Sequence, residues 1–213
     1  MAKYAVEVSA VTKTYGEETV LDDVSFCLEE GSIVGLVGRN GSGKTMLLRA
    51  LCGVVAVEGR IVVAEREVAG PAYVNPEVGA VIEAPGFLPR RSGFDNLWAL
   101  ARINRRATKG DVRAALETVG LDARSGKPVR TYSLGMRQRL GLAQAFMEHQ
   151  RVLFLDEPFN GLDERGVREM RELFKRFRDE GRTLLLATHN ADDVSTLCDG
   201  VMRMSSGRLS VEL

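Results

Sequence analysis

A glycine-rich segment places the strongest constraint on how this chain can fold. The segment runs from Gly38 to Thr45 and reads Gly-Arg-Asn-Gly-Ser-Gly-Lys-Thr, which matches the G-x-x-x-x-G-K-[ST] pattern of a phosphate-binding loop. The apolar run 32–37 before it predicts a buried strand, and the apolar residues in 46–51 predict a helix after it. This context indicates a helix N-terminus that faces phosphate groups.

Each residue type in this loop suits phosphate chemistry. Gly41 and Gly43 allow the backbone to turn its N–H groups toward phosphate oxygens, and Lys44 reaches the β- and γ-phosphates. The hydroxyl of Thr45 suits Mg²⁺. An ordinary glycine-rich turn is the alternative interpretation. We predict a nucleoside triphosphate site with these residues: Gly38, Arg39, Asn40, Gly41, Ser42, Gly43, Lys44, Thr45 and Met46.

Composition narrows the class of protein. The 213 residues, 45% of them hydrophobic, suffice for one domain with a sizeable core. The 29 basic and 29 acidic residues balance, and no dense basic run is present, so we expect no nucleic-acid partner. Cys27, Cys52 and Cys198 have no paired spacing, which predicts small core residues in a reducing compartment.

No segment of the sequence is typical of a signal peptide or a membrane span. The first seven residues lack an apolar region, and no run reaches the roughly 18 consecutive apolar residues of a transmembrane helix. We therefore expect a cytoplasmic chain whose contact with a membrane depends on a partner.

Strand and helix patterns alternate along the chain. Alternating apolar residues in 24–28 predict a strand, whereas residues 92–145 show helical spacing and predict a helical insertion. The apolar runs 152–155 and 183–187 predict buried strands, separated by an amphipathic helix over 167–177. This alternation predicts an α/β fold with a mainly parallel sheet behind the phosphate-binding loop.

A pair of acidic residues follows the predicted strand at 152–155. Ligands gather at the carboxyl ends of strands in such sheets, so Asp156 is placed to bind Mg²⁺. Glu157 is placed to act as general base toward the attacking water. A solvated acidic turn before Pro158 is the alternative.

Together with further motifs, these features resemble the ATP-binding subunit of an ABC transporter over nearly the whole chain. Tyr15 matches the aromatic residue that stacks on adenine in this family. The segment 132–139 resembles the family's signature, and 160–163 resembles the loop through which two subunits communicate. His189 matches the histidine that contacts the γ-phosphate.

The resemblance implies a site shared between two chains. ATP and Mg²⁺ bind between the phosphate loop of one subunit and the signature of the other, where Ser133 and Gly135 contact the γ-phosphate. Asp163 belongs to the communicating loop, and Lys44, Glu157 and His189 carry the catalytic roles. It further implies a second ATPase chain, in a homodimer, and an integral membrane permease on the inner face of the membrane.

The same resemblance implies a P-loop NTPase fold of ABC ATPase type. Residues 1–213 then form one ABC ATPase domain, with a core and an antiparallel β subdomain in about 1–90 and 150–213. A helical subdomain spans about 91–149.

Three positions depart from the family's usual pattern. Glu83 replaces a glutamine that touches the metal and the water; it could still coordinate Mg²⁺, but it brings negative charge close to the γ-phosphate. Leu134 and Met136 replace a glycine and a glutamine of the signature. With these substitutions the chain resembles the branch that includes bacitracin and lantibiotic exporters.

Two functions remain from this comparison. The first is an export ATPase that powers a separate permease, which docks near 87–98, unless Phe94, Leu97 and Trp98 simply pack the helical subdomain. The second is a soluble ABC ATPase that does mechanical work on a ribosome or on DNA. A nucleotide-binding regulator without turnover is disfavoured by Glu157 and His189.

Overall fold

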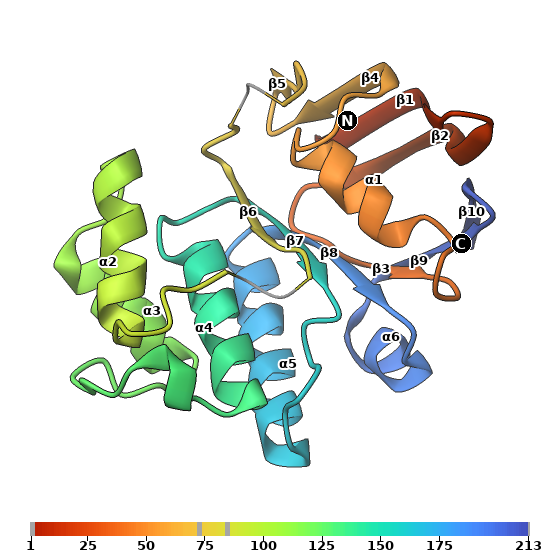
Figure 1. The fold of residues 1–213 in the computed structure, drawn as a ribbon. Coiled ribbons are helices and arrows are strands. Elements are labelled where there is room, and N and C mark those ends of the chain that lie inside the picture. The colour runs from red at the N-terminus through yellow and green to blue at the C-terminus, as the bar shows by residue number, and fades with distance from the viewer. Residues whose placement is uncertain (1–2, 72–73, 84–85, 213) are drawn as a thin grey trace.

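The computed structural model describes residues 3–71, 74–83 and 86–212, and its described strands form two sheets (Figure 1). An antiparallel sheet has the order β2-β1-β4-β5, and a six-stranded sheet has the order β10-β9-β3-β8-β7-β6. The strands are β1 Tyr4–Tyr15, β2 Glu18–Glu29, β3 Ile33–Val37, β4 Glu58–Val63, β5 Arg66–Glu67, β6 Val78–Val81, β7 Val152–Asp156, β8 Thr183–Thr188, β9 Gly200–Ser205 and β10 Arg208–Glu212.

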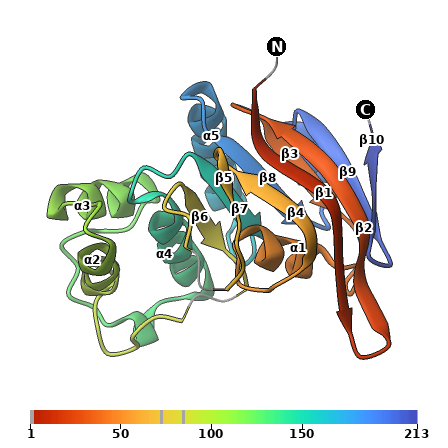
Figure 2. The ribbon, with the colours of Figure 1, turned by 90° about the horizontal axis from the view of Figure 1, so that it is seen from above.

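Helices cover the larger sheet and extend away from it (Figure 2). They are α1 Lys44–Leu51, α2 Gly93–Asn104, α3 Lys109–Thr118, α4 Leu134–Phe146, α5 Glu164–Asp179 and α6 Ala191–Leu197, with a 3₁₀ turn at Val129–Thr131. Strands β6, β7, β8, β3 and β9 pair in parallel, which confirms the predicted α/β fold. The helical content predicted for 92–145 is also confirmed, whereas the domain boundaries at 91 and 149 stay a prediction.

Strand β7, between β8 and β6, is buried on both faces because two separate cores lie against it. Val152 and Phe154 pack with α1 and the antiparallel sheet. Leu153 and Leu155 pack with α4 and α5 on the other face. A strand covered on both sides reads as a continuous apolar run, which is why the sequence at 152–155 showed no alternation.

The three cysteines differ in their surroundings. Cys27 is exposed, so the prediction that it is a core residue is wrong. Its neighbours Phe26 and Leu28 are buried in β2, and a strand points successive side chains to opposite faces. Cys52 and Cys198 are partly buried, and burial raises the pKa of each thiol to about 12.

The segment before and within α2 contributes mainly to packing. Leu97 is fully buried, and Phe94 and Trp98 are partly buried against the core that contains α4 and α5. Leu88 differs from them because 56% of its surface is exposed. Within the described residues, no helix has the length and apolarity needed to cross a membrane.

Candidate active site

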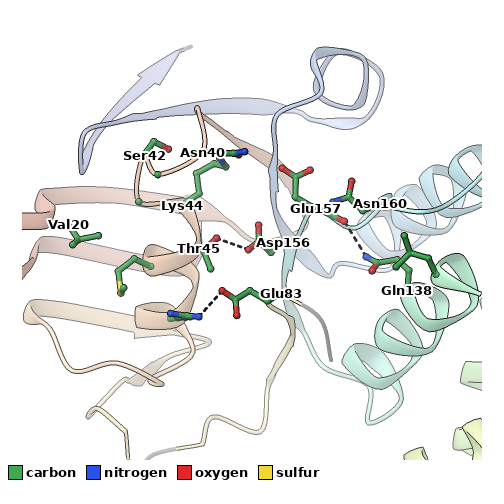
Figure 3. A pocket seen from close by; sticks show the side chains of 15 residues that line it. Val20, Asn40, Ser42, Lys44, Thr45, Glu83, Gln138, Asp156, Glu157 and Asn160 are labelled. Atoms are coloured by element: carbon green, nitrogen blue, oxygen red, sulfur yellow. Dashed lines mark hydrogen bonds and ion pairs between the residues drawn. The ribbon is translucent and has the colours of Figure 1, made fainter. Parts of the chain in front are cut away.

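Four parallel strands bring the predicted site residues to one edge of the larger sheet. Strands β3, β8, β7 and β6 are neighbours in that order, so their carboxyl ends meet at the same edge. The chain that follows them begins the phosphate loop at Gly38 and carries His189, Glu157 and Glu83, respectively. Residues that lie far apart in the sequence therefore surround one pocket of about 680 Å³ (Figure 3).

The phosphate loop requires glycine at its closest approaches. Gly43 caps α1 with a φ of 107°, in the left-handed region that favours glycine. A Cβ there would lie 2.9 Å from the carbonyl oxygen of Val20 and 2.8 Å from Cε of Met204. A Cβ on Gly38 would collide with the carbonyl oxygen of Met204. Because glycine has no Cβ at these two positions, the loop can lie close to β2 and β9.

Two buried polar groups in the loop suit an anionic ligand. Nζ of Lys44 donates to the carbonyl oxygens of Gly38 at 2.7 Å and Arg39 at 3.3 Å, which holds the ammonium group inside the loop. Oγ of Ser42 is buried, and no other described residue provides it with a hydrogen-bond partner. A buried hydroxyl without a partner costs free energy, and a phosphate oxygen would satisfy it.

Thr45 and Asp156 form the part of the pocket that suits Mg²⁺. Oγ1 of Thr45 donates to Oδ2 of Asp156 at 2.8 Å. Burial raises the pKa of the Asp156 carboxyl; the Thr45 hydrogen bond opposes this rise, and the charges of Glu157 and Glu83 add to it. No cluster of three or more His, Cys, Asp or Glu side chains within the described chain could hold a metal alone. Mg²⁺ fits such a site because it uses few protein oxygens together with water and phosphate.

Glu157 and His189 meet beside this pair. The Glu157 N–H donates to the carbonyl oxygen of Ala187 at 2.8 Å, and its Oε1 lies 2.7 Å from Nδ1 of His189. The φ of Glu157 is 45°, an uncommon value for a residue with a side chain. Such backbone strain clusters at functional sites, where the surrounding structure holds a side chain in one position.

Glu83 lies at the same edge but has a cationic partner. Its Oε1 accepts from Nη2 of Arg49 at 2.7 Å, and its φ is 57°. The next two residues, Ala84 and Pro85, lie outside the described residues. That Glu83 coordinates a metal stays a prediction.

The structure divides the predicted site residues into two groups. Those that line the pocket are Asn40, Gly41, Ser42, Gly43, Lys44, Thr45, Met46, Glu83, Asp156 and Glu157. Those that do not line it are Tyr15, Gly38, Arg39, Ser133, Gly135, Asp163 and His189. The lining also contains Val20 and Arg49, which were not predicted. Arg49 could have been found, since it lies one helical turn beyond Thr45.

Tyr15 lies beside the start of α1. Its ring is half exposed at the end of β1, and its hydroxyl lies 3.9 Å from Sδ of Met46, which lines the pocket. The Lys13 ammonium lies 4.8 Å from the centre of the ring. Tyr15 is therefore accessible to a flat ring, and its contact with adenine stays a prediction.

Ser133 and Asp163 both cap helices. Oγ of Ser133 accepts from the Met136 N–H at 3.1 Å and caps the N-terminus of α4. Oδ1 of Asp163 accepts from the Gly166 N–H at 2.8 Å and begins α5. These bonds give each residue a structural role in its own chain.

The signature helix also contacts the end of β7. Nε2 of Gln138 donates to the carbonyl oxygens of Glu157 at 3.2 Å and Pro158 at 3.0 Å. The exposed Leu134 side chain packs so close to Gly161 that a Cβ there would lie 2.5 Å from its Cγ. Within one chain, the start of α4 is thus held against the segment that follows β7 and contains Glu157.

Comparison with known proteins identifies the family. Residues 21–160 match the sequence profile of the family described as ABC transporter. The chain belongs to the ABC transporter family. It is 40% identical to the ABC transporter ATP-binding protein YybJ of Bacillus subtilis (strain 168), with 96% of this chain and 94% of that protein covered.

Relatives with named transport functions extend this result. The bacitracin transport ATP-binding protein BcrA of Enterococcus faecalis is 35% identical, with 99% of this chain and 70% of that protein covered. The lantibiotic transport ATP-binding protein SrtF of Streptococcus pyogenes is 31% identical, with 97% and 90% covered. A solved ATP-binding subunit of an ABC transporter has a TM-score of 0.88 at 25% identity, with 98% of this chain and 89% of that chain covered. The chain is an ATP-binding subunit of the ABC family and has the ABC ATPase fold. Its activity is ATP hydrolysis coupled to transport.

Proposed function

We propose that this ABC ATPase binds Mg²⁺ with ATP and powers a separate exporter permease for peptide antibiotics of the bacitracin or lantibiotic type. The observation that carries the catalytic part is the hydrogen bond between Thr45 and Asp156, in a pocket that Lys44 and Glu157 also line. The names of two relatives, which specify bacitracin and lantibiotic transport, support the exporter and its class of cargo.

Each residue in the pocket has a role in this proposal. Mg²⁺ supplies Lewis-acid stabilisation of charge on the phosphate oxygens, and Thr45 and Asp156 would hold it. Lys44 stabilises the β- and γ-phosphates. Glu157 orients the attacking water and accepts its proton. His189 holds the Glu157 carboxylate through the 2.7 Å contact between Nδ1 and Oε1.

The second half of the site comes from another copy of the chain. Ser133 and Gly135 lie at the N-terminus of α4, where backbone N–H groups favour an anion. Ser133 and Gly135 do not line the pocket of their own chain, and in this proposal they contact the nucleotide that the partner's phosphate loop holds. In this homodimer, two ATP molecules lie between phosphate loops and signature helices, and Asp163 belongs to the connection between the two sites.

The permease holds the chain at the cytoplasmic face of the membrane. The docking surface in this proposal lies beside the segment 87–98. In this segment Leu88 is exposed, whereas Leu97 is buried in the core. An apolar side chain at this place suits a short helix of the permease. Trp98, in the same segment, is partly buried against the core.

Co-purification from native membranes tests this function. The tagged chain is isolated from detergent-solubilised membranes and its partners are identified by mass spectrometry. We expect a stoichiometric membrane protein with several membrane spans to co-purify. Leu88→Arg should abolish this co-purification, whereas Ile103→Arg, a change at another exposed apolar residue, should not. Recovery of ribosomal or DNA-bound partners alone would contradict the proposal and support the mechanical ATPase.

A further inference from the structure

We propose that Arg49 is a positioning residue that pairs with Glu83 and thereby allows a carboxylate to border the nucleotide pocket. This inference rests on the proposed function, because it concerns how the same pocket tolerates a triphosphate. It assigns a role to a residue that the phosphate-loop motif does not include.

The geometry places the pair in the lining of the pocket. Arg49 lies four residues after Thr45 on α1, so the two side chains share one face of that helix. Both residues line the pocket, as does Glu83. Nη2 of Arg49 lies 2.7 Å from Oε1 of Glu83, a distance typical of a charge-assisted hydrogen bond.

The charges of the lining explain why this pair matters. The pocket has three carboxylates, from Glu83, Asp156 and Glu157, and its two cationic side chains among the described residues are Lys44 and Arg49. A triphosphate is strongly negative, so each carboxylate without a cation repels it. When Arg49 is removed, Lys44 alone opposes the three acidic groups. The affinity for nucleotide should then depend on the charge of Glu83.

The backbone around Glu83 places this residue at the same edge of the sheet as Glu157. Its φ of 57° lies in the left-handed region, and it follows β6, whose Val81 pairs with Leu155 of β7. Glu83 lies two residues after Val81, and Glu157 lies two residues after its paired residue Leu155. The Glu83 side chain therefore begins at the same edge of the sheet as Asp156, and the neighbouring cation of Arg49 offsets its negative charge.

Equilibrium binding of a fluorescent ATP analogue, with and without Mg²⁺, tests the role of Arg49. We expect Arg49→Ala to raise the Kd about fivefold, as loss of one close charge pair at a solvent-exposed site predicts. Arg49→Lys should restore most of the affinity because it keeps the charge. In a Glu83→Gln background, removing Arg49 should change the Kd by less than about twofold.

The matched control removes a second arginine that pairs with a glutamate. Arg60 lies 3.4 Å from Glu67 in the β4–β5 hairpin and does not line the pocket, so Arg60→Ala should leave the Kd unchanged. Unchanged binding in Arg49→Ala would overturn the inference, as would an equal loss in both Glu83 backgrounds. If the unsubstituted chain fails to bind, or Lys44→Ala binds equally well, the proposed function is at fault instead.

Discussion

Oε1 of Glu157 lies 2.7 Å from Nδ1 of His189, which joins the ends of the neighbouring strands β7 and β8. We expect His189→Ala to lower the rate of ATP hydrolysis at least about tenfold, because the carboxylate that orients water loses its support. ATP binding should persist. His149 is the matched control, since it is the other histidine and lies near Asp111, away from the pocket. Equal rates in His189→Ala and His149→Ala would remove His189 from the mechanism.

Gly43 tests whether the phosphate loop is sterically fixed. Gly43→Ala should lower the free energy of unfolding by about 2 kcal/mol or more and abolish ATP binding, since its Cβ meets the Val20 carbonyl and Met204. Gly16→Ala shares the positive φ, at 60°, but meets nothing within 4 Å, so it should cost only about 1 kcal/mol and keep binding. Urea unfolding curves measure both values. Similar curves for the two variants would show that the loop relaxes.

Substitutions of Asp163 distinguish a structural role as a helix cap from a role in communication between the two subunits. Asp163→Ala should lower the free energy of unfolding by about 1 kcal/mol, because the N-cap of α5 is lost. Asp163→Ser can restore the cap without restoring the carboxylate. If hydrolysis recovers together with stability in Asp163→Ser, Asp163 acts through the helix. Recovered stability with impaired hydrolysis would instead support the proposed communication between subunits.

Thiol labelling checks the placement of the cysteines. At about pH 8, iodoacetamide should modify Cys27 first, because thiolate and exposure decide reactivity. Burial raises the pKa of Cys52 and Cys198 to about 12, so little thiolate forms there and their labelling should remain slow. Burial and Glu7 also raise the pKa of Cys27, so its labelling should accelerate as pH increases. Mass spectrometry of Cys27→Ser provides the control, and rapid modification of Cys52 in the folded chain would contradict the structure.

Local patterns in the sequence predicted the strands and the phosphate loop because short-range sterics and burial determine them. The apolar run at 152–155 needed two cores to cover it, and the fold supplies both. Phe26 and Leu28 alternate with Cys27 along β2, and this alternation indicates that Cys27 points outward, whereas its residue type alone predicts a core residue. Such errors arise from treating a residue type apart from its position in the strand.

Long-range pairings could not be predicted in the same way. Arg49 and Glu83 are 34 positions apart, and their contact depends on how α1 packs beside the end of β6. The contact between Glu157 and His189 likewise depends on the order of β7 and β8 in the sheet. The resemblance predicted Glu83 and His189, and the place of Glu157 after a predicted strand assigned it to the same site, but tertiary packing decides which of these residues meet.

The molecular mass of Glu157→Gln in solution tests the central claim most directly. The chain has a mass of 23.3 kDa, and light scattering during gel filtration reports its oligomeric state. With saturating ATP and Mg²⁺, we predict that the variant doubles its mass, because it binds nucleotide between two chains but hydrolyses it at least about 100-fold more slowly. Without ATP it should remain a single chain. A mass of 23.3 kDa with ATP demonstrably bound would contradict the shared site.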